Sequence, residues 1–149
     1  MKVTAFALLF LGSLAALAAP EGKFEKSMAV PQGGDVKIGW NREGCGVTSL
    51  TVRNFPSRED IDTARREKHD DKSWVWWDFH VENTGDHKCR IQLWVDIYDR
   101  DGRAVKSSDR SDTVDAGKRD DNIRISTRMR TLDLADAAKV TLRDRKSVV

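Results

Sequence analysis

Apolar and polar residues alternate along much of the chain, which predicts β-strands because successive side chains of a strand point to opposite faces. The clearest run spans residues 74–82, where every odd-numbered position is apolar: Val75, Trp77, Phe79 and Val81. A second run spans residues 89–98 and has its own inward set: Cys89, Ile91, Leu93, Val95 and Ile97. Residues 83–86 between the two runs have turn composition. The pattern predicts a hairpin in which Trp77 lies opposite Val95.

Shorter alternating segments surround this predicted hairpin. Further strands are expected around residues 36–40, 47–53, 103–106, 123–129 and 140–142, with an edge strand within 24–30 and a polar loop over 109–121. The segment 57–68 differs, because Ser57 can cap a helix and Asp60 can return the hydrogen bond. The chain is therefore predicted to be all-β, an immunoglobulin-like sandwich of about seven antiparallel strands with one short inserted helix.

The first eighteen residues predict a cleaved export signal. Lys2 is the only charge there, an apolar run of about 15 residues follows, and Ala16-Leu17-Ala18 fits the small-x-small rule for cleavage after Ala18. A membrane anchor is the alternative, but a span needs about 20 residues. No later segment is apolar enough to cross a bilayer. After the signal (1–18) we expect an arm (19–34), the sandwich domain (35–145) and a tail (146–149), located in the periplasm or outside the cell.

Two cysteines, Cys45 and Cys89, lie in the part that would be exported. An oxidising compartment favours one disulfide between them. Two free thiols or a redox pair are the alternative, although the chain has no Cys-x-x-Cys spacing. A disulfide would stabilise the domain by restricting the unfolded chain.

The segment 81–105 resembles the FxLYD-type domains of bacterial envelope and secreted proteins. A strand ends in Asn83, and the motif positions are Val95-Asp96-Ile97-Tyr98-Asp99, followed by Gly102 in a turn. Tyr98 and Asp99 match the pattern, whereas Val replaces Phe and Ile replaces Leu. The helix near Ser57 and the cysteine pair lie outside it. The resemblance implies an immunoglobulin-like sandwich exported by a bacterium, in a family that mostly lacks assigned activity.

Composition and motifs point away from several function classes. The chain has 26 Lys and Arg against 24 Asp and Glu, and the two signs are interspersed, which argues against nucleic-acid binding. No Gly-x-Ser-x-Gly elbow or recognised triad pattern is present, so no catalysis and no cofactor are expected. No metal site is expected either. Asp99-x-Asp101-Gly102 resembles a fragment of a calcium loop, but it lacks the other acidic ligands and is better explained as a hairpin turn.

The outward face of the predicted hairpin is the candidate site. It would gather three Trp and one Tyr beside polar groups, namely Trp74, Trp76, Trp94, Tyr98, Asp78, His80 and Asp96. Four exposed aromatic side chains are costly, so either the helix or the N-terminal arm covers them, or they form a ligand platform.

The function expected from these features is a non-catalytic binding or protein-interaction module of the bacterial envelope. A carbohydrate-binding domain that uses the aromatic face is the alternative, so the partner is a protein or a glycan. A smaller basic row, Arg124, Arg128 and Arg130, is either a solvated strand face or a contact for an anionic surface. Nothing in the sequence indicates an oligomeric state.

Overall fold

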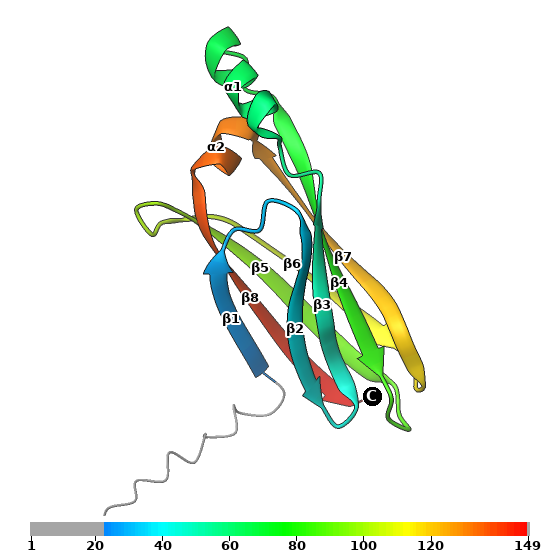
Figure 1. Cartoon of the computed structure of the whole chain (residues 1–149). Helices are drawn as coiled ribbons and strands as arrows, with labels where there is room; N and C mark the ends of the chain where they lie inside the picture. Colours follow the sequence, from blue (N-terminus) through cyan, green and yellow to red (C-terminus); the bar gives the residue numbers. More distant parts are fainter. Residues whose placement is uncertain (1–22, 149) are drawn as a thin grey trace, which may run out of the picture.

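The computed structural model describes residues 23–148, which form two packed antiparallel sheets of four strands each (Figure 1). The predicted signal and its cleavage point lie outside these residues. The elements in chain order are β1 (Lys23–Ala29), β2 (Gly34–Arg42), β3 (Cys45–Arg53), α1 (Arg58–Glu67), β4 (Lys72–Asn83), β5 (Cys89–Asp99), β6 (Ala104–Val114), β7 (Lys118–Arg130), α2 (Thr131–Asp136) and β8 (Ala137–Val148).

The two sheets have the strand orders β1-β8-β5-β6 and β2-β3-β4-β7. The predicted all-β sandwich with an inserted helix is thus confirmed, with eight strands in the described residues where about seven were expected. The expected edge strand within 24–30 is β1, which pairs with β8 along its whole length. The sandwich therefore starts at Lys23, inside the predicted arm. In the constant-type immunoglobulin order the first strand pairs with the second, whereas here the first described strand pairs with the last.

The inward positions predicted from the alternation form the core. Val75, Trp77, Phe79 and Val81 of β4 are fully buried, and so are Ile91, Leu93, Val95 and Ile97 of β5. The two sets line the inner faces of opposite sheets, as in other sandwiches. Trp77 donates its indole N–H to the Thr127 hydroxyl (3.0 Å), so the largest core side chain leaves no unpaired donor.

The predicted hairpin between β4 and β5 is wrong. Trp77 of β4 pairs with Val52 and Ile125, whereas Val95 of β5 pairs with Ser108 and Leu142. The turn residues 84–88 carry the chain from one sheet to the other. In both β4 and β5 the odd-numbered core side chains are apolar. These two sets of side chains face each other across the core, because the strands belong to different sheets and are not neighbours in one sheet. Alternation identifies a buried face, but it does not identify the hydrogen-bonded neighbour.

The predicted polar loop over 109–121 is also wrong, because β6 continues to Val114 and β7 begins at Lys118. The side chains of β6 are mostly exposed, since β6 is an edge strand. Backbone hydrogen bonds to β5 hold it in the sheet whatever the polarity of its side chains. The short helix α2 was not predicted. Its first residue, Thr131, donates its backbone N–H to the carbonyl of Asp71 (3.0 Å), which holds α2 to the start of β4.

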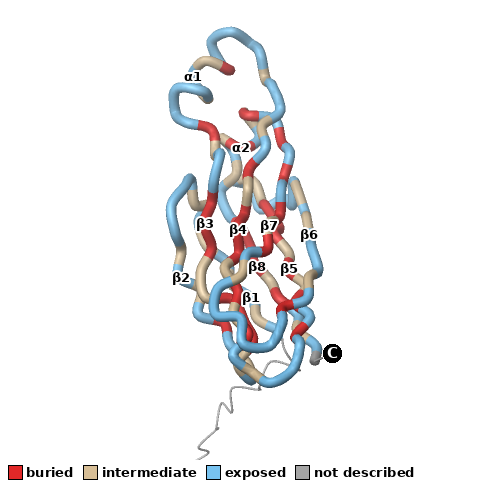
Figure 2. Tube along the Cα trace, turned by 90° about the vertical axis from the view of Figure 1, so that its right-hand side faces the viewer, coloured by how far each residue is buried: buried red, intermediate tan, exposed pale blue. Residues whose placement is uncertain are grey.

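The predicted helix near residues 57–68 is confirmed as α1. The Ser57 hydroxyl accepts the backbone N–H of Asp60, and the Asp60 carboxylate accepts that of Ser57, both at 3.0 Å, which forms the predicted capping box. Lys68 ends the helix in the left-handed conformation. α1 lies beyond one end of the sandwich, next to α2 (Figure 1), and it is largely exposed (Figure 2). Ala64 is its buried residue.

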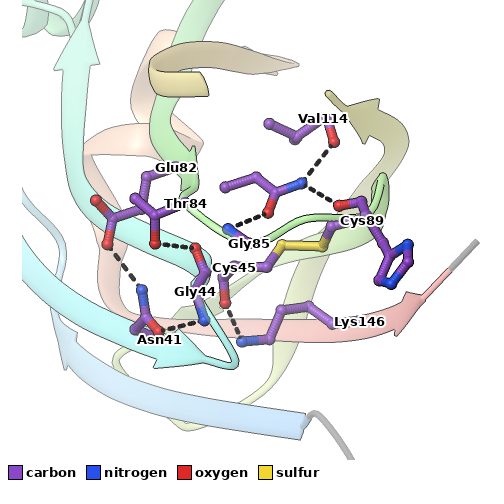
Figure 3. Close-up of a disulfide and its surroundings, with 11 residues drawn as sticks. Asn41, Gly44, Cys45, Glu82, Thr84, Gly85, Cys89, Val114 and Lys146 are labelled. Carbon is purple, nitrogen blue, oxygen red and sulfur yellow. Dashed lines mark hydrogen bonds between the residues drawn. A yellow bond between two sulfur atoms is a disulfide. The ribbon is translucent and has the colours of Figure 1, made fainter. Parts of the chain in front are cut away.

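The other end of the sandwich contains the predicted disulfide, which is confirmed (Figure 3). Cys45 begins β3 and Cys89 begins β5, so the bond joins the two sheets. Hydrogen bonds lock the neighbouring turns together: the Gly44 carbonyl accepts the backbone N–H of Thr84 (2.8 Å), and the Asn83 side-chain amide donates to the carbonyls of His87 (2.7 Å) and Val114 (3.0 Å).

Gly44 is required at its position between these turns. Its φ is +82°, and a Cβ there would lie 2.8 Å from the backbone nitrogen of Gly85. The turn after β2 and the turn after β4 therefore pack at backbone distance. The disulfide end is a rigid, closely packed part of the fold.

Candidate functional site

The predicted aromatic platform is divided between two outer faces of the sandwich. Trp74 and Trp76 lie on β4 in the sheet β2-β3-β4-β7, together with Asp78 and His80. The remaining predicted residues, Trp94, Asp96 and Tyr98, lie on β5 in the sheet β1-β8-β5-β6. The expectation that these side chains share one surface is therefore wrong, for the same reason that the hairpin is wrong.

The first of these faces combines tryptophan with arginine, and we call it the Trp–Arg face: Trp74, Trp76, Asp78, Arg53, Arg124 and Arg128. The register of β4 and β7 places Trp74 opposite Arg128 and Asp78 opposite Arg124. The Arg124 guanidinium lies 4.3 Å from the centre of the Trp76 ring, and that of Arg128 lies 5.7 Å from the Trp74 ring. Both distances are within the range of cation–π attraction.

Asp78 is the fixed centre of the Trp–Arg face, because its carboxylate is 1% exposed and bonded on both oxygens. Arg124 donates through Nε to Oδ1 (2.6 Å) and through Nη2 to Oδ2 (3.1 Å), and Arg53 donates through Nε to Oδ2 (3.0 Å). Burial raises the pKa of Asp78, but the hydrogen bonds and charges of Arg124 and Arg53 outweigh it, so the pKa is below its usual value. The bidentate pair also holds Arg124 over Trp76.

We expect the substitution Asp78→Ala to lower the free energy of unfolding by about 2 kcal/mol at pH 7, because it removes three charge-assisted hydrogen bonds while the two arginines turn toward water. Urea unfolding at pH 7 measures the loss. Asp120→Ala is the matched control, since that carboxylate is exposed on the same sheet and its loss is expected to change stability by less than about 0.5 kcal/mol. Equal losses in the two variants would contradict a central role for Asp78.

The uncovered part of the Trp–Arg face is the region around Trp74. This side chain is 50% exposed. Together with Trp76 and three small polar residues, Asn54, Ser73 and Ser126, it lines a shallow depression of about 660 Å³. Indole surface beside hydroxyl and amide groups suits a ligand with both apolar and hydrogen-bonding parts.

His80 lies on the same outer face in a line of side chains that resembles a catalytic triad. Its Nε2 is 2.8 Å from the Thr51 hydroxyl, and its Nδ1 is 3.6 Å from Asp120. However, the Thr51 hydroxyl donates its proton to Asp35 (2.5 Å), and Thr51 is buried. The arrangement fixes the His80 ring and does not present a nucleophile to solvent.

The second outer face repeats this construction around Asp96. Arg143 donates to the Asp96 carboxylate through Nε (3.0 Å) and Nη2 (2.9 Å), and its guanidinium lies 5.1 Å from the Trp94 ring. The Lys139 ammonium lies 4.6 Å from the Tyr98 ring. Trp94 and Tyr98 are both half-buried. Each sheet thus places cations from a neighbouring strand against its outer aromatic residues.

Within residues 23–148, neither α1 nor the described part of the N-terminal arm covers the predicted aromatic residues, so that alternative is wrong for this part of the chain. α1 lies beyond the end of the sandwich (Figure 1), and β1 is an edge strand. The cations that contact the rings belong to β7 and β8. Arg124 and Arg128 belong to the basic row seen in the sequence, but their position over Trp76 and Trp74 depends on the strand register. Arg53, Arg143 and Lys139 were missed for the same reason.

The remaining polar clusters have structural explanations. The Asp99 carboxylate accepts the backbone N–H groups of Asp101 (3.0 Å) and Arg103 (2.9 Å), which confirms the predicted hairpin turn. Within residues 23–148, no group of three or more His, Cys, Asp or Glu side chains is placed to hold a metal ion. In the same residues, no helix has the length and apolar character needed to span a membrane.

Comparisons with known proteins give no family for this chain. No family model matches it, and no curated protein matches it. One solved structure with some similarity is the enzymatically active domain of tailspike protein 4 from bacteriophage CBA120, with 7% identity and a TM-score of 0.25. The match covers 86% of this chain but 17% of that chain. A likeness at this level carries no argument about fold or function.

Proposed function

We propose that this chain is an exported, non-catalytic binding module of the bacterial envelope that recognises a protein partner through the Trp–Arg face. The FxLYD resemblance and the predicted signal (1–18) support export from a bacterium. The disulfide between Cys45 and Cys89 supports an oxidising compartment.

The observation that carries the proposal is Trp74, a half-exposed indole on a central strand with arginines beside it. Tryptophan and arginine are enriched among the residues that contribute most to protein–protein affinity. One of these arginines is held in place before any partner arrives, since Arg124 is fixed by Asp78 and stacked on Trp76. A partner that contacts Arg124 therefore restricts little freedom of that side chain.

A glycan ligand is the second candidate, and the depression beside Trp74 favours it. Sugar rings stack on aromatic faces, and the hydroxyls of Ser73 and Ser126 and the amide of Asn54 line the same depression. Arg128 lies over the Trp74 ring, so a stacking sugar would have to use the open side of the indole or displace this guanidinium.

We expect Trp74→Ala to reduce partner binding at least tenfold, which corresponds to about 1.4 kcal/mol. The measurement compares the immobilised mature chain, Trp74→Ala and Val105→Ala for the amount of each periplasmic protein captured from the bacterium that encodes the chain. Val105 is the matched control, because it is an exposed apolar side chain (42%) on the edge strand β6. A partner retained by the wild type and by Val105→Ala, but not by Trp74→Ala, supports the proposal.

The same three proteins on a glycan array distinguish the two candidates. Binding to a glycan that Trp74→Ala abolishes would replace the protein partner with the carbohydrate function. Identical capture by all three proteins, with no signal on the array, would exclude the Trp–Arg face as the binding surface. Thermal unfolding of each variant shows that the fold is intact, since both side chains are at the surface.

A further inference from the structure

We propose, building on the function proposed above, that the partner of the Trp–Arg face presents an acidic segment of its chain. In this arrangement an apolar side chain of the partner lies against Trp74, and carboxylates on either side of it bind the surrounding cations. Three features of the face indicate such a segment: an excess of positive charge, cations without a carboxylate partner, and an indole that is open on one side.

Positive charge is concentrated in the half of this outer face that lies next to the two helices (Figure 1). Across β3, β4 and β7, the outward positions from residue 72 to residue 78 and those paired with them hold five cations: Lys72, Arg53, Arg124, Arg128 and Arg130. They hold one carboxylate, that of Asp78, which is buried and already bonded to Arg53 and Arg124. This half is therefore positive, although the whole chain has a formal charge of only +2.

The strand register and the burial pattern agree that Lys72 and Arg130 extend the Trp–Arg face. Lys72 pairs with Arg130 across β4 and β7. In the next outward row, Trp74 pairs with Arg128. All four residues are exposed, whereas Met129, between the two arginines, is buried. Because successive side chains of a strand point to opposite faces, the four exposed side chains lie on the same side of the sheet.

Lys72, Arg128 and Arg130 are the cations that a partner can reach. None of the three forms an ion pair with a carboxylate within residues 23–148. Lys72 and Arg130 are also like charges directly opposite each other, an arrangement that destabilises a sheet. Carboxylates of a partner would pair with these cations and relieve the repulsion.

The two carboxylates that precede Lys72 in the chain interact elsewhere. Asp70 accepts the backbone N–H of Leu132 (2.9 Å) and so helps to hold α2 in place. The Asp71 carboxylate lies 3.1 Å from Nε2 of His69. The chain therefore does not use these neighbouring carboxylates to neutralise the face, which leaves its charge for a partner.

The side of Trp74 away from β7 is open. β3 ends at Arg53, opposite Trp76, so β7 is the one strand paired with β4 at Trp74. The Trp74 side chain is 50% exposed and lines the shallow depression described above. An apolar side chain of the partner placed there would bury indole surface, and the carboxylates beside it would be close to Arg128 and Lys72.

The second outer face lacks this combination. Its tryptophan, Trp94, pairs with Asp109 on β6 and with Arg143 on β8, so charges of both signs flank the ring. Arg143 is already bonded to Asp96, and Trp94 is half-buried. An acidic segment would therefore favour the Trp–Arg face over the equivalent surface of the other sheet.

The test uses the mature chain and the double variant Lys72→Gln/Arg130→Gln. The probe is a labelled random copolymer of glutamate and tyrosine, which presents carboxylates and apolar side chains in many spacings, and its fluorescence anisotropy measures the affinity. A copolymer of lysine and tyrosine is the control probe. The matched control variant is Lys118→Gln/Arg119→Gln, which removes two exposed cations from the other end of the same strand, β7.

We expect the wild type to bind the glutamate–tyrosine copolymer but not the lysine–tyrosine copolymer. Lys72→Gln/Arg130→Gln should bind about fivefold more weakly, because it removes two charges from the contact. Trp74→Ala should bind about tenfold more weakly, because it removes the apolar contact. Lys118→Gln/Arg119→Gln should stay within about twofold of the wild type. Removing the like-charge pair should leave thermal stability unchanged or slightly higher, so weaker binding would not reflect a damaged fold.

Two other anionic polymers test whether the segment belongs to a protein. A single-stranded nucleic acid or an acidic glycan also combines negative charge with groups that stack on an indole, so oligothymidine and polygalacturonate are compared with the copolymer at equal concentrations of anionic groups. Tighter binding of either one, with the loss in Lys72→Gln/Arg130→Gln, would assign the face to that class of ligand and overturn the acidic protein segment.

Two further results would overturn the proposal. The first is that the glutamate–tyrosine copolymer does not bind at concentrations up to about 1 mM, where even weak complexes form. The second is an equal loss of binding in the two double variants, which would mean that only the net charge of the chain matters.

The capture experiment described above separates this proposal from the function on which it rests. A protein that is captured equally by the wild type and Lys72→Gln/Arg130→Gln, but not by Trp74→Ala, would leave the protein-binding function standing and contradict an acidic partner. Capture that Trp74→Ala does not change would contradict the binding function itself.

Discussion

Replacing Cys45 and Cys89 by alanine is expected to lower the free energy of unfolding by about 4 kcal/mol, because the disulfide closes a long loop and restricts the unfolded chain. The two cysteines are 44 positions apart in the sequence and connect the two sheets. A domain of this size has a total stability of roughly 5–15 kcal/mol, so this is a large part of it. Urea unfolding of the double variant and of the oxidised wild type measures the difference.

The reduced wild type is the control for this prediction. It retains both sulfur atoms but lacks the bond, so any further loss in the double variant reports side-chain packing at two buried positions. Reduction should account for most of the loss. If the oxidised and reduced proteins unfold within about 1 kcal/mol of each other, the bond does not restrict the unfolded chain as the loop-entropy argument requires.

The sequence predicted which residues are buried better than it predicted which strands are neighbours. Burial follows from a local pattern: Trp77 and Val95 both lie at apolar odd positions, and both are fully buried. Pairing is a property of the whole chain. The strand β4 pairs with β3 and with β7, and about 46 residues separate its midpoint from that of β7. No periodicity within β4 indicates that its second partner comes so late in the chain.

The prediction that the candidate residues form one surface is wrong because it required β4 and β5 to be hydrogen-bonded neighbours. Trp74 and Trp94 have the outward orientation that the alternation predicted, but they lie on opposite sides of the molecule. Their cationic neighbours, Arg128 and Arg143, come from β7 and β8 and could be placed only once the register was known. By contrast, the capping box of Ser57 and Asp60 was predictable because its two residues are three positions apart.

Asp144 extends the two-residue alternation of its strand beyond the last apolar residue. Alternation through Val140 and Leu142 places residue 144 on the inner face as well. Its carboxylate is 2% exposed. The Phe24 backbone N–H donates to Oδ1 (2.7 Å), and Oδ2 has no hydrogen-bond partner within the described residues. A strand that changes from apolar to charged residues while keeping its two-residue period can still be buried.

We expect this buried carboxylate to make the protein less stable at neutral pH than at acidic pH, and Asp144→Asn to remove that part of the pH dependence. Burial raises the pKa of Asp144 from 3.8 to about 6, although the Phe24 N–H and the charges of Lys146 and Arg42 act in the opposite direction. Below pH 3.8 the folded and unfolded chains both carry the proton. Above pH 6 the folded chain must hold a buried charge, which costs about 3 kcal/mol relative to acid.

The measurement is the difference in unfolding free energy between Asp144→Asn and the wild type, determined by urea unfolding at about pH 8 and again at about pH 3.5. The difference should be about 3 kcal/mol more favourable to Asp144→Asn at the higher pH. Comparing the two pH values cancels any pH-independent effect of the new amide, which can still accept the Phe24 N–H through its oxygen. Asp62→Asn on the exposed side of α1 is the control and should show a change below about 0.5 kcal/mol. If Asp144→Asn and Asp62→Asn respond alike to pH, the Asp144 carboxylate is not held at a cost in the folded chain.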